Sequence, residues 1–279
     1  MYGPHDGDST MTYDARERSL FEAYPVELYL FARGAQYWRY TSADEDKVVE
    51  GVTYASVQIK RGAFEQNQEM SRSNLTLTMD KNINFLNQFR GSPPTDIVQL
   101  TIQRYHEGDG QLAVPWVGRV VNVKFLEREA EVRLEPVFTS LRRPTLRRMY
   151  QTTCPHVLYG AACGLSSANF RVDATLTGVS GRDLLSPAFS SFADGYFAGG
   201  YVDWEVAGVL ERRFIIAHVG QAITLNLPLA GIPANATVRA YPGCDHTLNT
   251  CHNKFNNVDN YGGQPFYPKK NPMNGTPIF

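Results

Sequence analysis

Four cysteines are the residues of this chain best suited to metal chemistry, and they occur as two pairs. Eight residues separate Cys154 from Cys163, and six separate Cys244 from Cys251. Thiolates bind zinc and iron–sulfur clusters, and in an oxidising compartment cysteines form disulfides instead. Each pair lies in turn-rich sequence, where backbone N–H groups are free to point at a sulfur atom. One site made from all four cysteines would join the start of the intervening sequence to its end.

The spacing leaves three chemistries open. Two disulfides can form outside the cell, but the chain shows no secretory signal, so we expect it to fold in the cytoplasm, where thiols stay reduced. A four-cysteine zinc site is chemically reasonable, although structural zinc favours cysteines two to four residues apart. An iron–sulfur cluster also takes four thiolates and accepts wider, irregular loops. Spacing therefore favours a cluster only slightly.

Three histidines lie close to the cysteines in sequence, namely His156, His246 and His252. Four thiolates already complete the ligand set of either metal site. These histidines are therefore interpreted as turn residues or as hydrogen-bond donors beside the site, rather than as ligands.

The elements that position the cysteines are predicted to be mainly strands. The chain of 279 residues is 43% hydrophobic and 20% charged, with a net charge of -1, so it lacks the basic excess of a nucleic-acid or membrane-surface binder. In Leu75–Met79 the apolar residues alternate, as on one face of a sheet. Turns are predicted at residues 107–110 and 127–129, and one helical turn before Gly91. Many short strands predict an antiparallel barrel or sandwich.

Two β-rich units are predicted along the chain. Residues 1–12 form a flexible head, residues 13–140 an N-terminal β-barrel or sandwich, and residues 141–279 a small β-domain with the cysteines and an extended tail. The segment over residues 240–272 is rich in Gly, Pro and aromatic residues, and it is predicted to be neither helix nor strand. A metal site would hold this segment in place, with Phe255, Tyr261 and Phe266 shielding the site from water.

The sequence around the cysteines resembles a signature of phage tail-tip proteins. The residues that carry the likeness are TCPH at 153–156, ACG at 162–164, PGCD at 242–245, CHNKFNN at 251–257 and NYGGQP at 260–265. They are similar to the minor tail protein L family of lambda-like siphophages and to the hub proteins of gene transfer agents and Mu-like prophages. The likeness extends over most of the chain from about residue 20.

The resemblance implies a [4Fe-4S] cluster on Cys154, Cys163, Cys244 and Cys251, with zinc as the alternative. It implies a homotrimeric hub in the virion, at the phage tail tip, made and assembled in the host cytoplasm. Its partners would be the ring of distal tail protein, the central fibre or hub protein of the receptor-binding assembly, and the tape-measure protein. The cluster would stabilise structure, because no flavin or nucleotide motif accompanies the cysteines.

Enzymatic activity is not expected. The chain has no Gly-x-Ser-x-Gly elbow and no phosphate-binding glycine loop. A cell-wall hydrolase would need a pair such as Cys163 with His218, but Cys163 belongs to the paired pattern. The other alternative is a receptor-binding or glycan-binding module of the tail, cross-linked by zinc or by disulfides. These two alternatives can be told apart: a scaffold should assemble with other tail proteins, whereas a receptor-binding module should bind cells when it is isolated.

Overall fold

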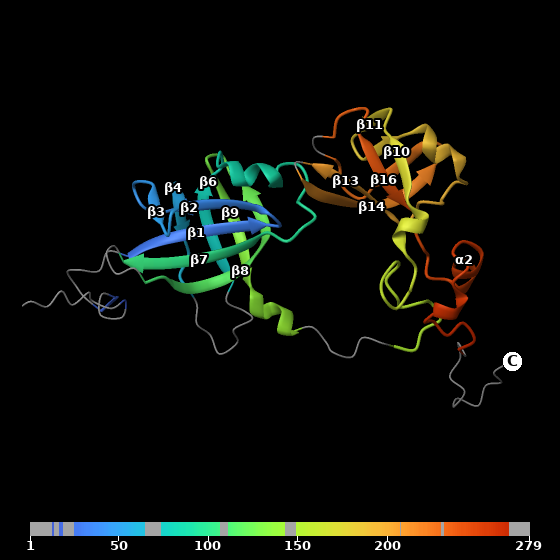
Figure 1. Cartoon of the computed structure of the whole chain (residues 1–279), viewed down its shortest axis with the longest axis horizontal. Coiled ribbons are helices and arrows are strands. Elements are labelled where there is room, and N and C mark those ends of the chain that lie inside the picture. The colour runs from blue at the N-terminus through green and yellow to red at the C-terminus, as the bar shows by residue number, and fades with distance from the viewer. Residues whose placement is uncertain are drawn as a thin grey trace, which may run out of the picture. The chain divides into compact units, whose positions relative to one another are not determined.

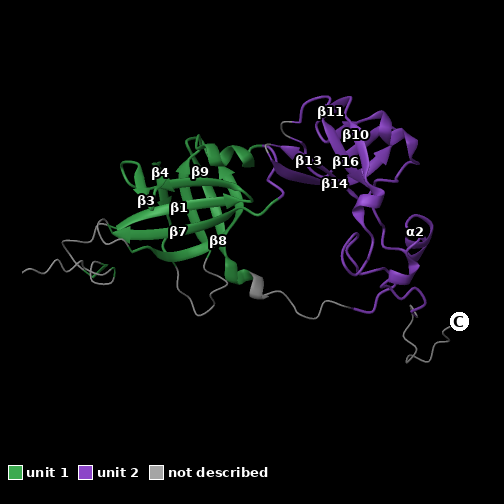
Figure 2. Ribbon diagram, in the orientation of Figure 1, with its two compact units in different colours: residues 1–90, 96–143 green, residues 91–95, 144–279 purple. Residues whose placement is uncertain are grey.

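The computed structural model describes residues 13, 17–18, 25–64, 74–106, 111–142, 149–206, 208–229 and 232–267. The predicted head, the predicted turn at 107–110 and the end of the tail from residue 268 lie outside these residues. The chain forms two compact units, shown in Figure 2. One comprises residues 1–90 and 96–143, and the other residues 91–95 and 144–279. The short segment Gly91–Thr95 therefore belongs to the second unit, although the sequence on both sides of it belongs to the first.

The first unit is one nine-stranded sheet that curls into a half-barrel (Figure 1). Its strand order is β3-β4-β2-β1-β7-β8-β9-β6-β5. The strands are β1 Pro25–Arg33, β2 Gln36–Thr41, β3 Lys47–Val49, β4 Val52–Ser56, β5 Ile59–Arg61, β6 Leu75–Asp80, β7 Gln99–His106, β8 Ala113–Phe125 and β9 Glu129–Pro136, with 3-10 helices η2 Asn84–Phe89 and η3 Val137–Arg142. Among the described strands, the sheet is antiparallel except where β2 pairs with β4.

The local predictions for this unit are confirmed where the structure describes them. Leu75, Leu77 and Met79 are buried on one face of β6, as their alternation predicts. Backbone N–H of Leu126 donates to Glu129 O at 2.8 Å and closes the second predicted turn. The helical turn before Gly91 is η2, and Phe85 on it packs against Phe31 in the core, with ring centroids 4.0 Å apart.

The carboxylate of Glu27, on strand β1 of the first sheet, is held by two arginines. Glu27 on β1 accepts hydrogen bonds from Arg61 Nε at 2.8 Å, Arg104 Nη2 at 2.9 Å and the Tyr29 hydroxyl at 2.8 Å. Burial by itself raises the pKa of Glu27, but the hydrogen bonds from Arg61, Arg104 and Tyr29 outweigh burial and lower the pKa from 4.5 to about 2.

The first unit should therefore lose stability in acid. Because the pKa of Glu27 is lower in the folded state, its contribution is complete above about pH 4.5 and is lost as the pH falls towards 2. The loss should be about 2–3 kcal/mol, measured as hydrogen-exchange protection of β1 and β7 corrected for intrinsic rates. Glu27→Gln should remove this pH dependence. The exposed Glu45→Gln should follow the wild-type profile, and an unchanged profile in Glu27→Gln would contradict the assignment.

The second unit is an antiparallel seven-stranded sheet with the order β10-β16-β13-β14-β15-β12-β11. Its buried core includes Phe189, Phe197, Val202, Ile215 and Val238. The strands are β10 Val172–Thr175, β11 Gly178–Ser180, β12 Asp183–Leu185, β13 Tyr201–Val206, β14 Val209–Val219, β15 Ala222–Leu225 and β16 Thr237–Tyr241, and the helices are η4 Ser167–Phe170, η5 Pro187–Ser191, α2 Leu248–Asn253 and η6 Val258–Asn260.

The mainly-β prediction is confirmed, and three details differ. The first sheet is a half-barrel whose terminal strands β3 and β5 are not paired with each other, one strand pair is parallel, and the segment predicted to be irregular contains the helix α2. Thr247 caps α2 by accepting a hydrogen bond from Thr250 N at 3.2 Å. None of the helices that the structure describes is long and apolar enough to span a membrane.

Candidate functional site: a pocket lined by four cysteines

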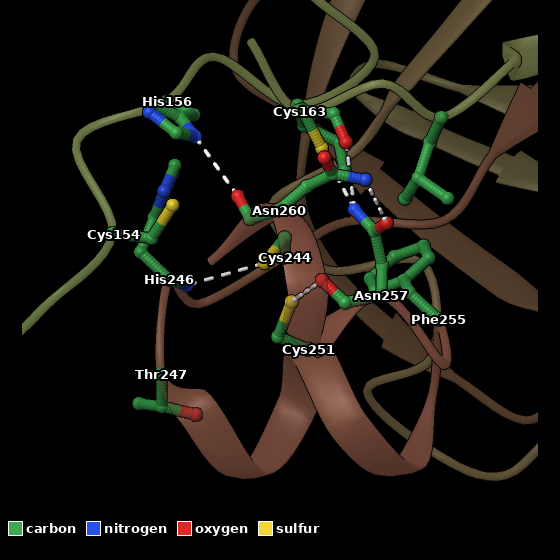
Figure 3. Close-up of a pocket in the computed structure, with 12 residues that line it drawn as sticks. Cys154, His156, Cys163, Cys244, His246, Thr247, Cys251, Phe255, Asn257 and Asn260 are labelled. Carbon is green, nitrogen blue, oxygen red and sulfur yellow. Dashed lines mark hydrogen bonds between the residues drawn. The ribbon is translucent and has the colours of Figure 1, made fainter. Parts of the chain in front are cut away.

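The pairing of β10 with β16 explains how the two cysteine pairs meet. These strands run antiparallel, with Val172 opposite Ala240. The chain that leads into β10 therefore lies at the same end of the sheet as the chain that leaves β16. Cys154 and Cys163 precede β10, Cys244 follows β16, and Cys251 lies on α2. All four line one pocket, shown in Figure 3.

The four cysteines carry free thiols, so the structure contains neither of the two disulfides considered above. Within the described residues, no three His, Cys, Asp or Glu side chains are placed so that they could hold a metal ion as they stand. The structure therefore does not show the four-cysteine metal site that the sequence predicts. The structure shows a pocket with four thiols from two distant parts of the chain.

Backbone N–H groups point at two of the sulfur atoms. His246 N lies 3.3 Å from Cys244 Sγ, and Gly262 N lies 3.4 Å from Cys154 Sγ. Cys154 N in turn donates to His246 O at 2.8 Å, which ties the first pair to the turn that follows Cys244. N–H donors favour the negative form of a sulfur atom, so these turns suit thiolate ligands.

The sulfur atoms also influence one another. Burial raises the pKa of the Cys244 thiol, and Asp245, Cys154 and Cys163 raise it further, while the His246 N–H lowers it. The pKa of Cys251 is raised by burial and then by the three other cysteines. Four thiolates in this pocket would repel one another, so a group that carries positive iron or zinc ions would stabilise all four in the charged form.

The turn before Cys244 is fixed by a lysine and a tyrosine. Lys254 Nζ donates to Tyr196 O at 2.5 Å and to Gly243 O at 2.7 Å. Burial lowers the pKa of Lys254, and the nearby Cys244 and Asp245 oppose this change. The Tyr159 hydroxyl donates to Pro242 O at 3.0 Å. The backbone just before Cys244 is therefore held by two side chains, one from the segment before β10 and one from the segment after α2.

Not all of the residues predicted to surround the cysteines line the pocket in the structure. His156 and His246 line the pocket, and His156 Nδ1 lies 3.1 Å from Asn260 O, whereas His252 is exposed. Phe255 is buried in the pocket wall. The predicted shielding by Phe266 is wrong, because its side chain is 92% exposed.

Tyr261 makes a hydrogen bond beside the pocket, while its shielding of the site stays a prediction, and His218 lies outside the pocket. The hydroxyl of Tyr261 donates to Thr152 O at 2.6 Å, which joins the two extended segments beside the pocket. His218, the partner considered for a hydrolase, is buried next to Phe189 O and Gly220 O and does not line the cysteine pocket.

Two asparagines were missed from sequence, Asn257 and Asn260, and both line the pocket. Asn257 is buried, and its side chain donates to Cys163 O at 2.7 Å. The signal for Asn257 was the run CHNKFNN, where a polar side chain follows closely after a cysteine and is available to satisfy the turn, whereas Asn260 begins the run NYGGQP.

Two phage protein families match the chain. Residues 29–166 match the family described as baseplate hub protein, N-terminal attachment domain. Residues 195–271 match a second phage family, described as phage conserved hypothetical protein BR0599. The first match includes Cys154 and Cys163, and the second includes Cys244 and Cys251.

One solved structure and one sequence relative are similar to this chain. A chain from the virion of a native gene transfer agent particle superposes with a TM-score of 0.80 at 21% identity, covering 95% of this chain and 94% of that one. An uncharacterised protein of Xylella fastidiosa (strain 9a5c) is 28% identical over an alignment of 177 residues, and the match covers 58% of this chain and 37% of that protein. The present chain thus spans little more than a third of that relative.

A β-rich chain with this fold and these two matches is of the phage tail structural class. Within that class, residues 29–166 are similar to the attachment domain of baseplate hub proteins, which agrees with the resemblance to phage tail hub proteins seen in the sequence.

Proposed function

We propose that this protein is a structural hub of the phage tail tip, located in the virion and forming a homotrimeric ring. The ring joins the distal tail protein at the end of the tail tube to the central fibre or receptor-binding assembly. The observation that carries this proposal is the match of residues 29–166 to the attachment domain of baseplate hub proteins. The role is structural and not enzymatic.

Exposed apolar side chains support a role in assembly. Val114, Val117 and Val121 on β8 are 52%, 40% and 59% exposed. Leu210, Phe214 and Ile216 on β14 of the second unit are similarly exposed. Such exposed apolar side chains are available for partner proteins to cover.

Electron microscopy of the phage would test the location. An antibody against this chain should label the distal end of the tail, and particles made without the chain should lack a complete tail tip. Labelling of the capsid or of the tail shaft would contradict the proposal. Sedimentation of the purified chain should give the mass of a trimer, and a monomer at all concentrations would overturn the ring.

We further propose that Cys154, Cys163, Cys244 and Cys251 hold a [4Fe-4S] cluster. Support comes from the four free thiols in one pocket and from the N–H groups aimed at two of their sulfurs. Such a cluster binds through four thiolates, and here it would join the segments before β10 and after β16. Its role would be to stabilise this end of the second unit.

The cluster proposal predicts the composition of the protein when it is prepared without oxygen. Iron and sulfide analysis should give about four of each per chain, and Cys251→Ser should lose them. If the analysis gives about one zinc per chain instead, the four cysteines bind zinc and not a cluster. A protein with neither metal would overturn both.

A further inference from the structure

Asn257 lies between the two cysteine pairs and contacts both. Its side-chain Nδ2 donates to Cys163 O at 2.7 Å and lies 3.7 Å from Cys163 Sγ. Its backbone N donates to Cys251 O at 3.0 Å, and its backbone O accepts from Cys251 Sγ at 3.1 Å. Figure 3 shows Asn257 between these two cysteines, which are far apart in the sequence.

The orientation of this amide follows from its partners. The carbonyl oxygen of Cys163 can only accept a hydrogen bond, so the atom 2.7 Å from it must be the amide nitrogen. Asn260 Nδ2 donates to Asn257 Oδ1 at 2.7 Å, which agrees with that assignment. The second hydrogen on the nitrogen is then available to the Cys163 sulfur.

Asn257 is also too buried to turn away from the cysteines without cost. The residue is only 8% exposed, and its amide fills the space beside Cys163 and Asn260. Leaving a buried amide without its hydrogen-bond partners costs about 1–3 kcal/mol of free energy, so the observed contacts hold the side chain in place.

We propose that Asn257 is the positioning residue that holds the two cysteine pairs together and donates an N–H to the sulfur of Cys163. The part that concerns the bound group rests on the proposed [4Fe-4S] cluster. Hydrogen bonds to cluster sulfurs raise the reduction potential, because they favour the more negative reduced state. The part that concerns the position of the cysteines holds for the protein without metal.

Asn257→Asp is the decisive variant, because it keeps the shape of the side chain and removes its N–H donors. In the reduced, metal-free full chain, brief oxidation by diamide should produce disulfides between the pairs, mapped by mass spectrometry of a non-reducing digest. Asn257→Asp should lower the yield of these disulfides several-fold relative to those within a pair. An unchanged yield would overturn the positioning role, whether or not the wild type binds iron.

The matched control is Asn253→Asp on α2. Its side chain is exposed and bonds Asn249 Oδ1 away from the cysteines, so the yield of disulfides between the pairs should equal that of the wild type. Asn257→Ala is the second variant and should behave like Asn257→Asp. Hydrogen exchange of β13–β16 should be unchanged in all three variants, and a general loss of protection there would overturn the specific role by showing that Asn257 only stabilises the fold.

In the protein loaded with iron, the reduction potential of Asn257→Asp should be more negative than that of the wild type and of Asn253→Asp. An equal potential would overturn the N–H donation to Cys163. If the wild type binds no iron while Asn257→Asp still lowers the disulfide yield, the cluster proposal fails and the positioning role stands.

Discussion

Replacing Arg213 with leucine should lower the free energy of unfolding of the second unit by about 3–5 kcal/mol. The side chain of Arg213 on β14 is 8% exposed, and it fixes the segment Gly91–Thr95 within this unit. Its Nη2 donates to Ser92 Oγ and Pro93 O, both at 2.9 Å, and its Nη1 donates to Thr95 Oγ1 at 2.8 Å.

The cost follows from the groups that the substitution leaves behind. Glu211 Oε2 lies 3.4 Å from Arg213 Nη1, and the Glu211 side chain is only 14% exposed. Without the guanidinium, the largely buried carboxylate of Glu211 and the buried hydroxyl of Ser92 lose this donor, and burying charge without its partner is strongly unfavourable.

Hydrogen exchange of β13 and β14 during urea unfolding would measure this loss for the second unit separately from the first. Arg171→Leu is a matched control, because it removes an arginine of the same unit that pairs with Asp173 at the surface, both side chains being about half exposed. The control should change the free energy of unfolding by less than about 1 kcal/mol. Equal effects of the two substitutions would refute the role assigned to Arg213.

Gly243→Ala should destabilise the second unit by about 3 kcal/mol and should displace Cys244 from the pocket. A Cβ atom at Gly243 would lie 2.0 Å from Ala198 O and 2.2 Å from Gly199 C. These are backbone atoms on a neighbouring segment, so no side-chain rotation can relieve the contact. The turn that carries Cys244 would have to move.

Two measurements test this prediction. Urea unfolding should show the lower free energy, and in the metal-free protein the rate at which iodoacetamide labels Cys244 should rise. Gly178→Ala is the control in the same unit, because its nearest contact is the flexible end of Leu185 at 3.3 Å. A Gly243→Ala protein with wild-type stability and wild-type labelling would show that the close approach is not needed.

The role of Gly243 could not be predicted from the sequence. Glycine in a turn usually allows backbone angles with positive φ, but Gly243 is absent from the described glycines with positive φ. Its role is to let two segments approach closely, and the partners Ala198 and Gly199 lie more than forty residues earlier in the chain. No local pattern predicts such a contact.

By itself, the sequence determined the features that depend on neighbouring residues. Alternating apolar positions such as Leu75–Met79 predict strands, because side chains on a strand point to opposite faces. The two cysteine spacings and the residues around them indicated the phage hub family, which the family matches confirm.

Only the tertiary structure decided which distant residues meet. The pairing of β10 with β16 brings the two cysteine pairs to one pocket, Asn257 bridges Cys163 and Cys251, and Gly91–Thr95 joins the second unit through Arg213. Apart from the contact between Asn257 and Cys251, these contacts join segments far apart in the chain, so no local pattern of the sequence indicates them. The sequence therefore specifies the chemistry of the thiols, and the fold specifies that they share one site.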